Sequence, residues 1–145
     1  MDILESFSAP TAAWFRGAFA RPTDAQTGAW AAISAGRHAL VVAPTGSGKT
    51  LSAFLWALDR VFRDDRGAET LPGFEGRTTA RAKRRTKILY ISPLKALGVD
   101  VERNLQSPLV GITQAAKRLG VDPPEVSVGV RSGDTPPRDR QRMLR

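Results

Sequence analysis

The segment from residue 43 to residue 50 constrains this chain more than any other, and it reads Ala-Pro-Thr-Gly-Ser-Gly-Lys-Thr. It follows the apolar run 39–42 and precedes a helical pattern, which is the strand, glycine-rich turn and helix order of a phosphate-binding loop. In such a loop, glycines let backbone N–H groups turn toward phosphate oxygens. Lys49 would supply a positive charge to the β- and γ-phosphates, and the Thr50 hydroxyl would ligate Mg²⁺. Ala43 replaces the usual first glycine, but the remaining pattern predicts nucleotide binding.

Hydrophobic periodicity predicts alternating helices and buried strands along the chain. Helices are expected over 11–20, 23–35, 48–62, 93–106, 107–119 and 138–144, and strands over 38–43, 87–92 and 125–130. Thr23 is suited to cap the second helix. Three apolar strands separated by helices indicate an α/β fold, a parallel sheet covered by helices on both faces. Ligands bind such sheets at the carboxyl ends of the strands, so we expect the loops 44–50, 92–96 and 131–135 to meet at one edge.

Large apolar side chains at helical spacing are interpreted as core rather than as ligand contacts. In the 48–62 helix they form a stripe of Leu51, Phe54, Leu55, Leu58, Val61 and Phe62. Trp14, Trp30 and Trp56 also fall within helical patterns, and His38 begins a strand. We therefore expect structural roles for these four residues.

The positive charge of the chain is concentrated in two segments. There are 22 Lys and Arg against 14 Asp and Glu, a net charge of +8. Residues 77–87 carry six basic and no acidic side chains, and residues 131–145 carry five arginines against two aspartates. This pattern favours a polyanion partner, although a solvated loop and tail explain it equally well from composition alone. All of the first segment except Lys87 lies within 64–86, which we interpret as an exposed basic insertion.

Composition excludes several other classes. The chain has 145 residues, enough for one domain, and no cysteine, which excludes disulfides and cysteine-bound zinc. No signal peptide is visible, and no apolar stretch approaches the ~20 residues that span a bilayer. We expect a cytoplasmic protein without a membrane partner.

Three further stretches identify a family resemblance. They are Pro-Thr-Asp-Ala-Gln at 22–26, Ser-Pro-Leu-Lys-Ala-Leu at 92–97 and Arg-Ser-Gly-Asp-Thr-Pro at 131–136. Together with the phosphate loop, their order and spacing resemble those of superfamily-2 ATP-dependent helicases. The particular residues of these motifs resemble those of the large helicase-related (Lhr) family. The resemblance implies that residues 1–145 are the N-terminal portion of a RecA-like domain, three-layered around its parallel sheet.

The resemblance also implies ATP and Mg²⁺ as cofactors. The expected ATP-binding residues are Gln26, Thr45, Gly46, Ser47, Gly48, Lys49 and Thr50, with Lys49 and Thr50 catalytic and Thr50 on the metal. Gln26 would read adenine through its carboxamide, or alternatively brace the loop. An aromatic side chain often stacks on the base in this family, and the candidates are Phe7, Phe15 and Phe19.

Nucleic acid is the partner that the resemblance implies, single-stranded or partly duplex, with DNA favoured. Ser92, Pro93, Leu94 and Lys95 resemble motif Ia, which holds the strand backbone, and Gly133 and Thr135 resemble the next strand-contacting motif. A solvated surface position is the alternative for Lys95. Asp134 would repel phosphate, so we expect it to cap the last helix or to hold Arg131.

Two parts of a helicase motor are missing from the sequence. ATP hydrolysis needs a carboxylate that holds Mg²⁺ and orients water, which helicases supply from an Asp-Glu box, and no Asp-Glu pair occurs here. The second RecA-like lobe is also absent. We therefore expect a fragment of a longer helicase, which needs the remainder of that chain and has no turnover alone. The alternatives are a non-catalytic nucleic-acid-binding module and, less favoured, a phosphate-loop kinase.

Overall fold

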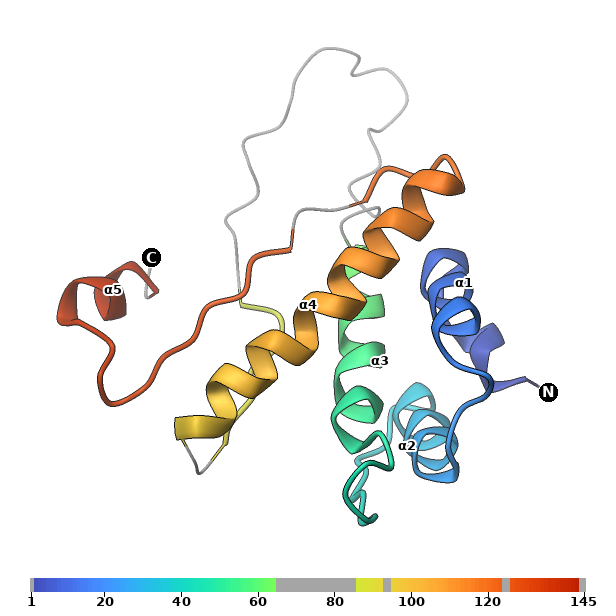
Figure 1. Ribbon diagram of the computed structural model, residues 1–145, viewed down its shortest axis with the longest axis horizontal. Helices are drawn as coiled ribbons and strands as arrows, with labels where there is room; N and C mark the ends of the chain where they lie inside the picture. Colours follow the sequence, from blue (N-terminus) through green and yellow to red (C-terminus); the bar gives the residue numbers. More distant parts are fainter. Residues whose placement is uncertain (1, 65–85, 93–94, 124–125, 144–145) are drawn as a thin grey trace.

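The computed structural model describes residues 2–64, 86–92, 95–123 and 126–143 (Figure 1). Its elements are the short 3₁₀ helix η1 (Ile3–Ser6) and the helices α1 (Ala9–Ala18), α2 (Asp24–Ser34), α3 (Lys49–Asp64), α4 (Lys95–Arg118) and α5 (Pro137–Arg142). The predicted insertion 64–86 lies outside the described residues except at its two ends. No helix among the described residues is both long enough and apolar enough to cross a membrane.

An aromatic cluster forms the centre of the core. Trp30 of α2 is fully buried, and its ring lies edge-to-face against Phe7 and Phe15, with centroids 4.9 and 5.5 Å away. Its indole N–H donates to the carbonyl of Ser52 in α3 at 3.0 Å, which satisfies the polar atom that burial removes from water. Trp14 and Trp56 pack against this cluster from half-buried positions, so the structural roles predicted for the tryptophans are confirmed.

Helix α3 buries the stripe that its sequence predicts. Phe54, Leu55, Leu58 and Phe62 are buried, whereas Leu51 and Val61 are half-buried. The helix therefore gains most of its stability from packing this stripe rather than from helix propensity. At its last turns Asp59 is fully buried and accepts hydrogen bonds from the backbone N–H and the hydroxyl of Ser8, at 3.0 and 2.5 Å. These bonds connect α3 to the start of α1. Within α3 the Arg63 guanidinium lies 2.8 Å from the Asp59 carboxylate, and it also donates to the carbonyl of Ser6 at 2.6 Å.

Helix α4 is one continuous helix, and the predicted division into 93–106 and 107–119 is wrong. Pro108 lies inside it and is buried. A proline removes one helical hydrogen bond, but Leu105 and Ile112 on the same side of the helix are buried and hold the two halves in line. The predicted end is confirmed, since α4 stops before Gly120, whose φ of 68° is left-handed.

No strand is assigned among the described residues of the three predicted strands, which are drawn as extended chain over 38–43, 87–92 and 126–130 (Figure 1). The prediction of burial is wrong for most of their apolar side chains: Leu40 is 91% exposed, Val42 85%, Leu89 78% and Ile91 81%. A strand needs a neighbour that accepts and donates its backbone hydrogen bonds. The apolar pattern of 38–43 or 87–92 predicts a strand but does not supply that neighbour.

Helices α1 to α4 pack together, and α5 lies apart from them. Figure 1 shows α1, α2, α3 and α4 gathered together, with α1 along α4 and α2 along α3. Helix α5 lies at the far side of the molecule, at the end of an extended segment that begins at residue 126. The core of the described chain is the helical cluster, and the phosphate-binding sequence is located at its lower end, at the start of α3.

Candidate functional site

The glycine-rich loop leads directly into α3. Gly46 and Gly48 have φ values of 84° and 79°, a left-handed conformation that strains any residue with a Cβ. Ser47 closes the turn, since its N–H and hydroxyl both donate to the carbonyl of Pro44, at 3.3 and 2.7 Å. Glycines thus occupy the two positions where this turn requires them, as the sequence pattern indicates.

Lys49 is the first residue of α3, and its ammonium group lies in the mouth of the loop. Nζ donates to the carbonyls of Ala43 and Pro44, the latter at 2.6 Å. Thr50 is exposed on the first turn of the helix, and Thr45 is exposed in the loop. The lysine, the loop carbonyls and the positive end of α3 are therefore within reach of one another.

Gln26 braces this loop from α2. It is 4% exposed, and its carboxamide oxygen accepts from the N–H of Thr23 at 3.0 Å, while its nitrogen donates to the carbonyl of Gly48 at 3.4 Å. Thr23 and Gln26 form a complete capping box on α2, so the predicted cap is confirmed. The Thr23 hydroxyl also donates to the carbonyl of Ser47 at 2.8 Å, a second link to the loop that sequence reasoning did not identify.

These bonds use both ends of the carboxamide, as the alternative role of Gln26 requires. Contact with adenine stays a prediction, since the carboxamide keeps one acceptor site on its oxygen and one N–H donor beyond these two bonds. Gln26 lies so close to the loop that a Cβ on Gly48 would collide with its side chain.

Burial separates the three aromatic candidates for base stacking. Phe7 and Phe15 are buried in the core, at 5% and 0% exposure. Phe19 is 43% exposed and follows the C-terminal end of α1, where it packs on Phe15 and Trp14. Phe19 is the candidate with a ring surface still open to a ligand.

The residues that resemble motif Ia are described in part. Ser92 is half-buried at the end of an extended segment, and Lys95 begins α4. Pro93, Leu94 and the Lys95 side chain lie outside what the structure describes. Their expected contact with a nucleic-acid backbone stays a prediction.

The segment 132–135 forms a tight turn before α5. The N–H of Thr135 donates to the carbonyl of Ser132 at 3.2 Å, and the Thr135 hydroxyl accepts from the N–H of Ser132 at 2.8 Å. Gly133 lies at the exposed tip. The prediction that Asp134 caps the last helix is wrong, because Pro136 occupies the cap position of α5. Pairing of Asp134 with Arg131 stays a prediction.

A residue outside the predicted set, Arg140 of α5, is bonded to this turn. Its guanidinium donates to the carbonyls of Ser132, Gly133 and Thr135, at 3.3, 2.5 and 2.8 Å. An arginine one turn into a helix carries no sequence signal for such a role, because its acceptors are backbone atoms that exist only once the turn has formed.

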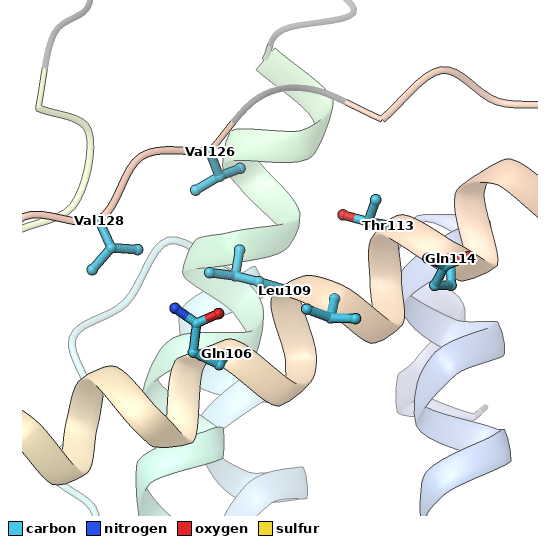
Figure 2. Close-up of a pocket in the computed structure, with 7 residues that line it drawn as sticks. Gln106, Leu109, Thr113, Gln114, Val126 and Val128 are labelled. Atoms are coloured by element: carbon cyan, nitrogen blue, oxygen red, sulfur yellow. The ribbon is translucent and has the colours of Figure 1, made fainter.

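Two open grooves lie near these elements. One, of about 360 Å³, runs between α4 and the extended segment 126–128 (Figure 2). It is lined by valine, leucine, threonine and glutamine side chains and includes none of the predicted site residues. The other, of about 500 Å³, is lined by Val130, Thr135, Pro136, Asp139, Arg142 and Met143. Of these two grooves, only the second is lined by both a predicted binding residue, Thr135, and a basic side chain, Arg142.

The expected convergence of all three loops at one edge is not seen. The phosphate loop enters α3 at the bottom of Figure 1, whereas the turn before α5 lies at the left, beyond the start of α4. Gln26 and the phosphate loop are brought together, and the 132–135 turn forms a separate site. No group of three His, Cys, Asp or Glu side chains in the described ranges could hold a metal ion.

Comparison with known proteins follows the same motifs. The sequence pattern of the DEAD/DEAH box helicase family matches residues 23–134, which begin at the capping box and end in the turn before α5. The chain is 55% identical over 143 residues to a Mycolicibacterium smegmatis protein named "Lhr helicase/ probable uracil glycosylase", covering 99% of this chain and 9% of that protein. It is 48% identical to the "Lhr helicase/uracil glycosylase" of Escherichia coli, covering 96% of this chain and 8% of that protein.

A solved structure extends the similarity to the fold. The chain is 53% identical, with a TM-score of 0.82, to a chain described as Mycobacterium smegmatis helicase Lhr bound to ssDNA and AMP-PNP. The match covers 99% of this chain and 16% of that one, so the present chain spans a small part of its relatives. The fold is RecA-like, and the resemblance to Lhr helicases is confirmed. Because the family pattern covers most of its length, this chain belongs to the DEAD/DEAH box helicases.

Proposed function

We propose that this chain is the N-terminal part of the ATP-binding lobe of a helicase that moves along nucleic acid. The observation that carries the proposal is the glycine loop at the start of α3, with Lys49 held in its mouth and Gln26 behind it. The named relatives are helicases, and one was solved with ssDNA and AMP-PNP. Activity belongs to the longer protein, together with the remainder of the helicase chain.

The residues of the loop fit an ATP triphosphate. The left-handed Gly46 and Gly48 allow backbone N–H groups of the loop to face phosphate oxygens, including that of Thr45, whereas the Ser47 N–H would first have to leave the carbonyl of Pro44. Lys49 would exchange its bonds with the carbonyls of Ala43 and Pro44 for bonds with phosphate oxygens. Bound ATP supplies the phosphoanhydride bond whose hydrolysis drives movement.

Thr50 is the residue that would ligate Mg²⁺, since its hydroxyl is exposed beside the loop. The sequence contains no Asp-Glu pair. The carboxylate that holds the metal and orients water would therefore come from elsewhere in the longer protein. We assign Lys49 and Thr50 to catalysis within that complete site.

Nucleic acid would bind on the other side of the molecule, with a single-stranded or partly duplex DNA as the favoured ligand. Ser92, Pro93, Leu94 and Lys95 at the start of α4 would hold one part of the backbone. Gly133 and Thr135 would hold another, beside the groove that also contains Arg142. The basic residues of 77–87 would add sequence-independent phosphate contacts.

We further propose that the extended segments 38–43, 87–92 and 126–130 are strands of a parallel sheet. Their apolar pattern and the match to the solved Lhr chain support this arrangement. Neighbouring strands, within this chain and from the longer protein, would form the ladder hydrogen bonds of the sheet and cover Leu40 and Ile91. The sheet would then form the middle layer of a three-layer domain.

The test of the nucleotide site is Lys49→Ala, measured in the full-length protein for ATP binding and for ATP hydrolysis stimulated by single-stranded DNA. Lys117→Ala, at an exposed position in the last turn of α4, is the matched control. We expect the first variant to lose hydrolysis and the second to keep it. Strand binding and activity that ignore Lys49→Ala would contradict the proposal and favour a binding module without turnover.

A further inference from the structure

Arg140 makes a set of contacts that phosphate binding does not explain. Its guanidinium donates three hydrogen bonds, and all three acceptors are main-chain carbonyls of the turn that precedes its own helix. The side chain is half-buried, whereas Arg138 on the same short helix is exposed. The planar fork of an arginine is suited to several acceptors at fixed positions, which a lysine cannot match.

The turn that Arg140 holds is also bonded within itself. The Thr135 hydroxyl accepts from the Ser132 N–H at 2.8 Å, and the Thr135 N–H donates to the Ser132 carbonyl at 3.2 Å. A hydroxyl that accepts one hydrogen bond keeps its own proton to donate. The Thr135 side chain lies on the groove of about 500 Å³, so that proton can be directed to a ligand in the groove.

We propose that Arg140 is a positioning residue, which keeps the 132–135 turn in the conformation that presents the Thr135 hydroxyl to a nucleic-acid phosphate. This inference rests on the proposed function, because Thr135 is there assigned to the strand. It adds a residue whose charge acts on the protein backbone rather than on the nucleic acid. Because Nε and one terminal nitrogen of Arg140 are bonded to carbonyls of the turn, we expect the guanidinium to stay on the turn when the strand binds, without a phosphate contact of its own.

The first experiment measures the turn without any ligand. Hydrogen exchange of the Ser132 and Thr135 amides is compared in the full-length protein, in Arg140→Gln and in the matched control Arg138→Gln. We expect exchange at both amides to become at least about tenfold faster in Arg140→Gln, the effect of a lost charged hydrogen bond, and to stay unchanged in Arg138→Gln. Unchanged exchange in Arg140→Gln would overturn the positioning role.

The second experiment measures single-stranded DNA affinity as a function of salt for Arg140→Gln, Thr135→Val, Thr135→Ser and the double variant Arg140→Gln with Thr135→Val. We expect Arg140→Gln and Thr135→Val each to weaken binding about tenfold, and the double variant to be no weaker than either alone. Thr135→Ser keeps the hydroxyl and should keep the affinity. The salt slope should not change in Arg140→Gln, and a slope reduced by about 0.7 would mean that Arg140 itself binds phosphate, which overturns the inference.

The two proposals fail in different ways. If Thr135→Val leaves the affinity unchanged, the strand contact proposed for Thr135 is wrong, and the link from Arg140 to binding is wrong with it. The exchange rates still decide whether Arg140 orders the turn. If Thr135→Val weakens binding while Arg140→Gln does not, the strand contact stands and the positioning role is wrong.

Discussion

The helical cluster and the extended segments both contain large apolar side chains, but these lie in opposite environments. Leu55 in α3 is fully buried, whereas Leu40, in the segment before the phosphate loop, is 91% exposed. A helix satisfies its backbone internally, so α1 to α4 need only apolar faces to pack together. A strand satisfies its backbone only through a neighbour, so 38–43 and 87–92 remain exposed in the absence of one.

The candidate sites follow the same division. The phosphate loop lies where an extended segment meets the helical cluster, and the cluster holds it through Thr23 and Gln26. The 132–135 turn lies away from the cluster and is held locally by Arg140. One site is therefore stabilised by packing at a distance in sequence, and the other by a neighbour in sequence.

A matched pair of truncations tests this contrast with the largest expected effect. Leu55→Ala should cost about 2–5 kcal/mol of unfolding free energy, because it opens a cavity in the core. Leu40→Ala in the same 145-residue chain should change it by less than about 0.5 kcal/mol. Denaturant unfolding monitored by circular dichroism measures both.

The same pair sharpens the sheet proposal when it is measured in the full-length protein. There, Leu40→Ala should also cost about 2–5 kcal/mol, because the paired strand buries it. A full-length protein that is indifferent to Leu40→Ala would contradict the sheet. A 145-residue chain already sensitive to it would contradict the exposed position of the segment.

A glycine pair tests the packing of the cluster itself. A methyl group on Gly111 of α4 would collide with the Trp14 indole of α1, so Gly111→Ala should lower the unfolding free energy by about 1–3 kcal/mol. Gly28 in α2 has open space around it, and Gly28→Ala should raise it by about 0.5–1 kcal/mol. Thermal unfolding should show a lower midpoint temperature for Gly111→Ala and a higher one for Gly28→Ala. A midpoint raised equally in both variants would mean that α1 and α4 leave room for a methyl group at Gly111.

The link between cluster and loop is tested by Gln26→Ala. Loss of its bonds to Thr23 and Gly48 should cost about 1–2 kcal/mol of unfolding free energy, against less than about 0.5 kcal/mol for the exposed Gln106→Ala. If Gln26 acts as a brace, affinities for ATP and GTP should fall by the same factor. Calorimetry that shows loss of ATP affinity alone would instead support contact with adenine.

The elements predicted from sequence are those whose cause is local. The stripe from Leu51 to Phe62, the capping box at Thr23 and the stop at Gly120 each depend on a few neighbouring residues, and the structure contains all three. The left-handed Gly46 and Gly48 are predicted for the same reason. The family resemblance was equally accessible, because its motifs are short runs of the chain.

The features that sequence did not predict depend on contacts across the fold. Whether Pro108 ends a helix depends on what buries Leu105 and Ile112, and no local pattern gives that information. Arg140 bonds to carbonyls of a turn, and a carbonyl has no sequence signature. Burial of Leu40 depends on a neighbouring strand, which an apolar pattern cannot specify.

The smallest expected effect concerns the surface of the cluster. Arg16 of α1 donates to the Asp2 carboxylate at 2.7 Å, and this bond, followed by that from the Leu4 N–H, holds the pKa of Asp2 below its ordinary value of 3.8. Because the folded-state pKa is lowered, the pair stabilises the fold above about pH 3.8 and loses its effect as pH falls through the lower value. Both side chains are exposed, so the contribution should be small at any pH.

An NMR titration of the Asp2 carboxyl measures this pair directly. In Arg16→Gln the pKa of Asp2 should move back toward 3.8, since the largest cause of the shift is removed, while the unfolding transition at neutral pH stays almost unchanged. A large loss of stability in Arg16→Gln would contradict the view that burial holds the cluster together. An unmoved pKa would mean that the Arg16 bond is not the main cause of the shift. If stability at neutral pH is almost unchanged in Arg16→Gln, the cluster owes its stability to buried side chains such as Leu55 and Trp30. The apolar side chains of the extended segments can contribute in the same way only when another part of the protein covers them.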